Sequence, residues 1–180
     1  TIPGYAAGSW SCDGGTQNAS NVTLSLGQNV TCTITNNDIA AHLIVIKHVI
    51  NDNGGLLGAA DFSMTIGGVT ATGGNTFPGA ESTGTNKTLA TVGSYTVTES
   101  AVTGYTQTSA SADCSGTIAL GETKTCTITN DDIAPKLHLR KVVVNDNGGT
   151  ATVADFILTA NGTGANDLSG TSPVDSGAGL

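Results

Sequence analysis

Three polar side chains, a lysine, a glutamate and an asparagine, stand at the ends of otherwise apolar strand patterns. Lys47 interrupts the aliphatic run "LIVIKHVI" at 43–50, Glu99 ends "SYTVTE", and Asn130 ends "TCTITN". A buried lysine needs a charged partner or must lose its proton, and a neutral lysine amine is a nucleophile. Whether this chemistry is available depends on the strands that position the three residues.

Alternation along two copies of the lysine strand indicates that the lysine points into the core. The second copy, "LHLRKVVV" at 137–144, has His138 and Arg140 on one face, which must face solvent, and Lys141 on the other. Lys47 holds the same place in the first copy. The other two polar residues also share faces with apolar ones: Glu99 with Tyr95 and Val97, and Asn130 with Cys126 and Ile128. All three side chains are therefore expected to meet in one core.

A long internal repeat organises the chain. The stretch "CTITNNDIAAHLIVIKHVINDNGG" begins at Cys32, and its near copy "CTITNDDIAPKLHLRKVVVNDNGG" begins 94 positions later, at Cys126. A unit of this length suits a small domain repeated in tandem. We predict that residues 1–38 are the second half of one β-sandwich unit, 39–132 a complete unit, and 133–180 the first half of a further unit.

Composition favours strands and excludes several classes of function. Charged residues make up 11% of the chain, and 14 acidic residues outnumber 6 basic ones, for a net charge of −8. This acidity argues against nucleic-acid partners and anionic membrane surfaces. No apolar run approaches membrane-spanning length. The abundance of Gly, Thr, Ser, Asn and Val suits strands joined by turns, so we predict an all-β fold of tandem antiparallel, immunoglobulin-like sandwiches.

Within the complete unit, five strands and one weaker strand are predicted from alternation and from the turn residues between them. The five are expected at 43–50, 61–66, 94–100, 105–112 and 123–130, and the weaker one within 77–92.

The four cysteines form two local pairs, Cys12 with Cys32 and Cys114 with Cys126, and each pair flanks a turn-rich stretch. A disulfide across a hairpin explains both pairs with one geometry. Zinc is the competing interpretation, but CxxC spacing is absent and the histidines lie elsewhere. Disulfides place the protein in an oxidising, extracellular or cell-surface setting.

The order of these motifs resembles the collagen-adhesin B-repeat and SpaA-type pilin domains, which are prealbumin-like sandwiches of microbial surface proteins. "LIVIKHVINDNGGLLGAADFSMTI" is similar to the opening of that family, "GSYTVTESAVTGYT" to its middle strand pair, and "TCTITND" to its closing strand. The resemblance covers residues 39–132, and its halves recur in 1–38 and 133–180. It implies a structural module of an extracellular stalk, fibre or pilus-like filament. An adhesin that binds a host protein or glycan through its loops, with 67–87 as the candidate loop, is the alternative.

The resemblance also implies a role for the three polar residues. In many family members a lysine of the first strand and an asparagine of the last form a spontaneous isopeptide bond, promoted by a buried acid on a middle strand. These roles fall on Lys47, Asn130 and Glu99. A buried Lys47–Glu99 salt bridge with Asn130 hydrogen-bonded nearby, and a solvent-exposed Lys47, remain as alternatives.

Other chemistry has weak support. The "NDNGG" turns place Asp52 and Asp146 as weak calcium candidates, but a plain Asn-Gly turn explains them without a metal. Because no catalytic triad order, phosphate loop or close carboxylate pair is recognisable, we predict no enzyme beyond a single-turnover cross-linking step, and no cofactor. The expected partners are copies of the chain or adjoining repeats of a longer chain, arranged head to tail, because each end segment alone would expose an apolar face.

Overall fold

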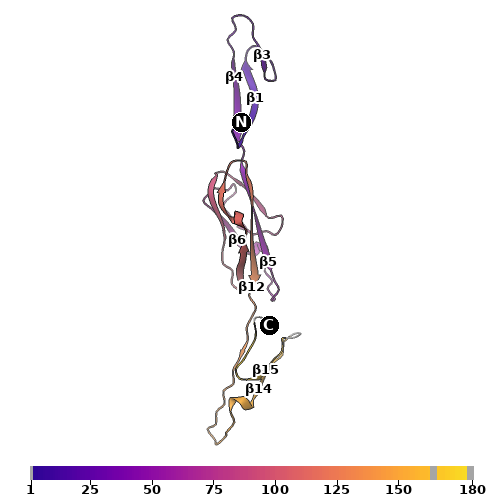
Figure 1. Ribbon diagram of the computed structural model, residues 1–180, viewed down its shortest axis with the longest axis vertical. Coiled ribbons are helices and arrows are strands. Elements are labelled where there is room, and N and C mark those ends of the chain that lie inside the picture. Colours follow the sequence, from indigo (N-terminus) through magenta and orange to yellow (C-terminus); the bar gives the residue numbers. More distant parts are fainter. Residues whose placement is uncertain (1, 163–165, 178–180) are drawn as a thin grey trace.

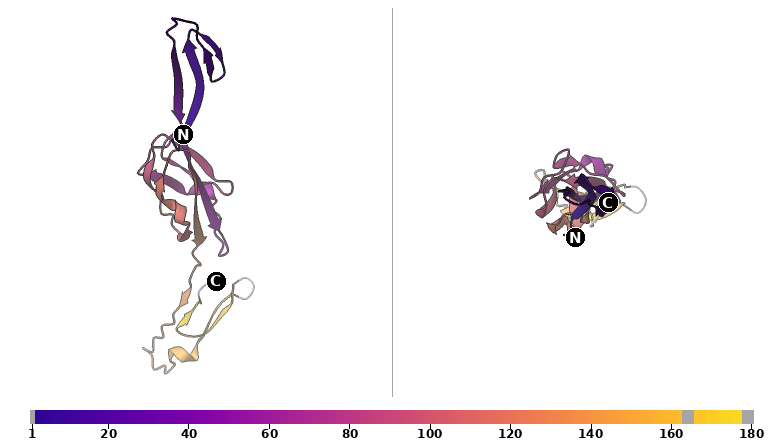
Figure 2. Two further views of the ribbon diagram at one scale, coloured as in Figure 1. Left: turned by 45° about the horizontal axis from the view of Figure 1, so that its top comes forward. Right: turned by 90° about the horizontal axis from the view of Figure 1, so that it is seen from above.

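The computed structural model describes residues 2–162 and 166–177. These residues form strands and three short 3-10 turns, in three segments that follow one another along the long axis of the molecule (Figure 1 and Figure 2). No helix among them is long and apolar enough to cross a membrane. The expected all-β fold is confirmed.

The central segment is a two-layer sandwich. One sheet has the strand order β10-β12-β5-β8 and the other β11-β9-β6-β7. Two 3-10 turns, η1 (Ala59–Asp61) and η2 (Ala112–Cys114), lie between strands. The strands are β5 (Ala41–Ile50), β6 (Ser63–Gly67), β7 (Thr76–Pro78), β8 (Thr85–Leu89), β9 (Gly93–Glu99), β10 (Tyr105–Ala110), β11 (Ser115–Ile118) and β12 (Thr123–Asp132).

Alternation along β5 decides which side chains enter the core. Leu43, Val45 and Lys47 are at most 1% exposed, whereas His48 is exposed. The same alternation in β9 buries Tyr95 and Val97. The core therefore lies between the inner faces of the two sheets, and Lys47 is one of its largest fully buried side chains.

One strand pair departs from the antiparallel expectation. β12 pairs with β5 in parallel, with Ile128 opposite Lys47 and Asn130 opposite Val49, while the other strand pairs of this segment are antiparallel. Parallel neighbours need a long connection, and here the whole remainder of the unit lies between the two strands. The first and last strands of the unit therefore lie side by side.

Two local predictions were wrong. Residues 115–118, expected to be part of a turn, form β11, because Ile118 is buried and the stretch pairs with β9. The strand expected from residue 61 begins at Ser63 because Asp61 caps a 3-10 turn, its carboxylate accepting the Gly58 N–H at 2.8 Å.

The end segments pair strands, and their described residues form no second layer over their apolar side chains. Trp10, Val142 and Phe156 are 42%, 79% and 36% exposed. At the start of the chain, β1 (Tyr5–Asp13) pairs with β4 (Thr31–Asp38), and β2 (Thr16–Asn18) with β3 (Asn21–Thr23). At the end, β13 (His138–Leu139) pairs with β16 (Val174–Asp175), β14 (Ile157–Ala160) pairs with β15 (Leu168–Thr171), and η3 (Val153–Asp155) precedes β14.

The residues that follow β4 and β12 make the same backbone hydrogen bond to a glycine. The Ile39 N–H donates to the Gly4 carbonyl at 2.8 Å, and the Ile133 N–H donates to the Gly104 carbonyl at 2.8 Å. Both glycines have positive φ, 82° and 85°, a conformation that other residues rarely adopt. Each junction between segments is therefore built around the same glycine turn.

Candidate functional site

The Lys47 side chain is fully buried on the inner face of β5. Its Nζ lies 3.1 Å from Glu99 Oε2, and the two side chains are 0% and 8% exposed. The same amine donates to the His48 carbonyl at 3.3 Å and sits 4.4 Å from the centre of the Phe62 ring. The alternative of a solvent-exposed Lys47 is thus not what the structure shows.

Asn130 of β12 lies opposite Val49 of β5, two residues along from Lys47, and its side chain is on the same inner face. Asn130 is 3% exposed. It lines a surface pocket together with Glu99, Tyr105 and Gln107. The structure therefore brings all three predicted residues to one end of the core.

Two buried oxygens of this site accept no hydrogen bond from the described residues. They are Asn130 Oδ1 and Glu99 Oε2, whose contact with Lys47 has the length of an ion pair but not the angles of a hydrogen bond. Unsatisfied buried acceptors are rare and unfavourable.

Burial shifts the amine toward its reactive form. Desolvation is the largest influence and lowers the pKa of Lys47 from its ordinary value of 10.5, although the close contact with the Glu99 carboxylate and the charge of Glu81 partly oppose it. A lysine with a lowered pKa carries a larger fraction of neutral, nucleophilic amine.

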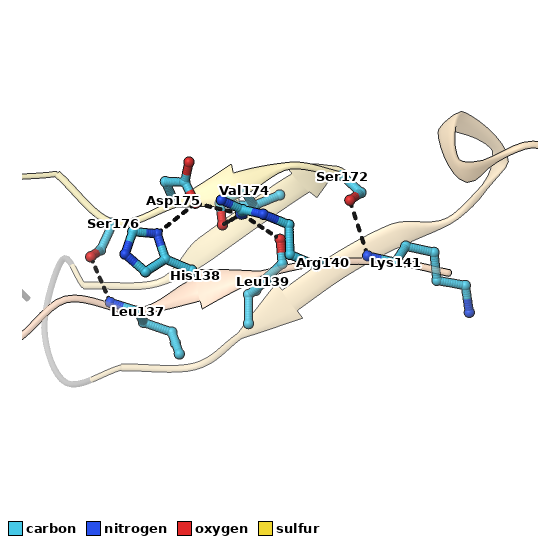
Figure 3. A network of polar contacts seen from close by, with 9 residues as sticks. All are labelled: Leu137, His138, Leu139, Arg140, Lys141, Ser172, Val174, Asp175 and Ser176. Carbon is cyan, nitrogen blue, oxygen red and sulfur yellow. Dashed lines mark hydrogen bonds and ion pairs between the residues drawn. The ribbon is translucent and has the colours of Figure 1, made fainter. Parts of the chain in front are cut away.

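The repeated lysine, Lys141, lies over an aromatic ring as Lys47 does, but no carboxylate of the described residues lies within ion-pair distance of it. Lys141 Nζ lies 4.3 Å from the Phe156 ring centre, which matches the Lys47–Phe62 contact. On the exposed face, His138 and Arg140 both contact Asp175, and Lys141 extends away from them (Figure 3).

A second polar cluster ties the end of β12 to the turn after β5. The Tyr105 hydroxyl donates to Asn51 Oδ1 at 2.6 Å and accepts the Leu57 N–H at 3.0 Å. The Asp132 carboxylate, in a residue 6% exposed, accepts the backbone N–H groups of residues 52, 53 and 55. Burial would raise the pKa of Asp132, but these hydrogen bonds outweigh it and lower the pKa.

Sequence reasoning missed this latch, which we define as Tyr105 and Asp132 bound to the turn 51–57. The signal was present, because "NDNGG", the "GY" pair and an aspartate two positions after the strand asparagine ("NND" and "NDD") each occur twice in the chain. Phe62 was missed as the ring under Lys47, although Phe156 repeats it.

The calcium candidates separate in the structure. Asp52 lies with Asp131 and Asp132, with one carboxylate oxygen of each within 4.8 Å of the others, and Asp146 joins no such group among residues 2–162 and 166–177. The Asp132 carboxylate is already used by backbone N–H groups. The weak calcium prediction at Asp52 and Asp146 stays a prediction.

Both cysteine pairs are bonded, but in two different settings. Cys12 and Cys32 lie opposite each other in the β1–β4 hairpin, as expected. Cys114 lies in η2 and bonds to Cys126 of β12, and both are buried. The expected hairpin geometry is wrong for this second pair, because the chain after Cys114 crosses to the other sheet as β11.

A two-layer sandwich with adjacent first and last strands and a lysine–acid pair between its sheets defines a repeated structural domain. The chain belongs to the family of SpaA-type prealbumin-like fold domains, whose model matches residues 1–34, 38–128 and 132–179. No curated protein and no solved structure matches the chain significantly. The resemblance drawn from the sequence motifs is thereby confirmed.

Proposed function

We propose that this chain is a load-bearing structural module of an extracellular fibre or stalk, built from tandem sandwiches with covalent cross-links. In this proposal residues 39–132 are one complete unit, and residues 1–38 and 133–180 are parts of neighbouring units. The observation that carries it is the buried Lys47–Glu99 pair, with Asn130 on the adjoining last strand. The family and the two disulfides support a secreted or surface location.

The strand arrangement supports a mechanical role. The chain enters the unit at the start of β5 and leaves at the end of β12, and these two strands are parallel neighbours. Tension on the chain therefore pulls them along each other, against all hydrogen bonds of the pair at once. A bond from Lys47 to Asn130 would join these two strands covalently, so that the force passes through this bond and the strands cannot slide apart.

The proposed reaction needs only side chains of this site. The neutral amine of Lys47 attacks Cγ of Asn130, the Nζ–Cγ bond forms, the Cγ–Nδ2 bond breaks, and ammonia leaves. The protonated Glu99 carboxyl gives its proton to the departing nitrogen and takes one from the attacking amine, so Glu99 ends as it began and the protons balance. Fixed positions in the core supply the effective concentration. The product is permanent, so this is maturation of a structural protein and not turnover.

The fold gives little support to the alternative function of an adhesin that binds a ligand through its loops. The candidate loop 67–87 contains β7 and part of β8, and both strands pair within the sandwich. Its aromatic residue, Phe77, packs against the core and lies under the Lys87 amine. Most of this stretch therefore builds the domain.

Intact mass tests the cross-link directly. We expect the full chain to be lighter than its sequence mass by one ammonia, after allowing for two disulfides, and Glu99→Gln to keep the full mass. Glu81→Gln is the matched control, because Glu81 also lies near Lys47 but is half exposed and binds His48 and the Val49 N–H. Full mass in the unmodified chain would refute the cross-link.

The rate of cross-linking after refolding should be flat around neutral pH. The ion pair and its reactive tautomer, a neutral amine beside a protonated carboxyl, each hold one proton, which can move across the 3.1 Å contact without exchange with solvent. Because burial lowers the pKa of Lys47, this proton is lost, and the rate falls, before the pH reaches 10.5. The measurement starts from chain that was prepared unfolded and has not yet reacted, for example by chemical synthesis. Mass spectrometry after folding at a series of pH values then gives the rate, and a rate still rising at that pH would contradict the prediction.

A further inference from the structure

Asn130 lies at the edge of the core, where it borders an open pocket. Lys47, the proposed nucleophile, is fully buried between the two sheets. The pocket has a volume of about 310 Å³, and Asn130, Glu99 and Gln107 are all part of its wall. A side chain at this wall therefore has room to turn toward the Asn130 amide.

The proposed reaction places negative charge on the Asn130 oxygen. When Lys47 Nζ attacks Cγ, the carbonyl electrons pass to Oδ1, and such an oxyanion is best stabilised by a hydrogen-bond donor already in place. Asn130 Oδ1 is buried, yet it accepts no hydrogen bond from the residues that the structure describes. Glu99 is used for proton transfer, and its Oε2 lies 3.1 Å from Lys47 Nζ. The reaction therefore calls for one more donor beside Asn130.

The two strands beside β12 offer one such donor. Val49 lies opposite Asn130 on β5 and has an apolar side chain. Gln107 lies directly opposite Asn130 on β10, in an antiparallel pair. The side chains of such a pair share one face, and their Cβ atoms lie about 4.5–5.5 Å apart. The Gln107 amide is therefore within reach of the Asn130 amide.

The two hydroxyl groups next to Gln107 in the sequence serve elsewhere. The Tyr105 hydroxyl donates to Asn51 Oδ1 at 2.6 Å, as part of the latch. Thr106 lies opposite Asp131, and alternation turns its side chain to the other face of the sheet. Gln107 is exposed, and its amide carries two N–H donors. It is therefore the side chain of this strand that can serve Asn130.

We infer that Gln107 takes part in the cross-linking reaction by donating an Nε2 hydrogen bond to Asn130 Oδ1. This bond strengthens as the carbonyl electrons move onto Oδ1. When the intermediate collapses, the electrons return to the carbonyl, and the nitrogen leaves as ammonia with a proton from Glu99. Gln107 itself gives up no proton and ends unchanged. The inference rests on the proposed function, because it assigns a further residue to the same reaction.

The repeat contains the same strand pair without this donor. Ala7 lies opposite Asn36 in the β1–β4 pair, as Gln107 lies opposite Asn130 in the β10–β12 pair. In both pairs the register shifts directly after this position. The strand pair therefore forms without a glutamine, and variants of Gln107 are expected to fold.

Gln107→Met removes the donor and keeps the length of the side chain. Starting from unfolded chain that has not yet reacted, mass spectrometry after folding gives the rate of ammonia loss. We expect this variant to react about 100-fold more slowly than the unmodified chain, as when one oxyanion donor is removed from an enzyme. Ser109→Ala is the matched control, because Ser109 is an exposed residue of the same strand outside the pocket wall. It should react at the unmodified rate.

Gln107→Glu tests the hydrogen bond itself. A protonated carboxyl donates a hydrogen bond and a carboxylate only accepts, so the new carboxyl serves below its pKa and fails above it. The ordinary glutamate pKa is about 4.3, and the charge of Glu99 in the same pocket raises it. We therefore expect the rate of this variant, divided by the unmodified rate at the same pH, to fall about tenfold or more between about pH 4 and pH 7. The ratio removes the titration of Lys47 and Glu99, which both chains share.

The outcomes separate this inference from the proposed function. Ammonia loss at the unmodified rate in Gln107→Met would overturn the role of Gln107 and leave the cross-link standing. A slow Gln107→Met with a rate ratio for Gln107→Glu that does not change with pH would also overturn it, because a residue that only supports the fold has no such titration. An unmodified chain that keeps its full mass would refute the cross-link, and the role of Gln107 with it.

Discussion

Replacing Lys47 with methionine is expected to destabilise the central unit by about 3–5 kcal/mol, because it leaves the Glu99 carboxylate buried without its counter-charge. The two side chains are 0% and 8% exposed, so water cannot replace the missing partner. The change also removes the amine from the Phe62 ring and prevents a bond to Asn130. Urea unfolding of the full chain, followed by tyrosine fluorescence, measures the effect.

A double variant separates the ion pair from the covalent bond. Adding Glu99→Leu to Lys47→Met removes the unpaired charge, and buried ion pairs are often replaced by apolar residues without loss of stability. We therefore expect the double variant to recover the electrostatic part of the loss but not the part supplied by the cross-link. A single Lys47→Met variant that loses less than about 1 kcal/mol, as exposed pairs do, would contradict the burial of this pair.

Removing the Cys114–Cys126 disulfide is expected to destabilise the central unit by about 3 kcal/mol, the value for closing a short loop in the unfolded chain. The two cysteines are 12 residues apart, and Cys126 is fully buried in the core. The paired change to alanine therefore adds a packing loss to the loss of the cross-link. Thermal unfolding of the oxidised chain and of the variant measures the difference.

The other disulfide supplies the control. Cys12 and Cys32 join β1 to β4, outside the core of the central unit. The same change to alanine at this pair should leave the unfolding of residues 39–132 unchanged. Equal losses for the two variants would mean that the hairpin and the central unit unfold together, against the separate units proposed here.

The faces of the strands could be read from the sequence because side-chain alternation is a local property. His138 and Arg140 identified the solvent-exposed face of the strand at 137–144. The burial of Lys47 in the first copy, at 43–50, follows the same alternation. The repeat also predicts the three segments 1–38, 39–132 and 133–180, and these bounds stay a prediction. Alternation and repetition need no knowledge of which strands are neighbours.

The features that could not be predicted from the sequence all depend on contacts between residues far apart in the chain. Alternation assigns a face to β5 and β12 but says nothing of their parallel pairing, which joins the two ends of the unit. The latch consists of side chains bound to backbone groups 48 to 80 positions away in the chain, and such contacts leave no periodic trace. Cys114 lies in a single 3-10 turn, too short to produce a pattern, so its setting could not be told from that of a hairpin.

The glycine turns at the two junctions have a geometric consequence for any longer array. Ile39 and Ile133 each donate to a glycine with nearly the same φ, so one unit is followed by the next through the same local step. Repeating a single rotation and translation always generates a helix, whose pitch is set by that step alone. In a fibre of such units, equivalent exposed side chains, such as the ion-paired His138, Arg140 and Asp175, would therefore follow a regular spiral. A small change of backbone conformation at the glycine turn would alter the pitch of the whole fibre.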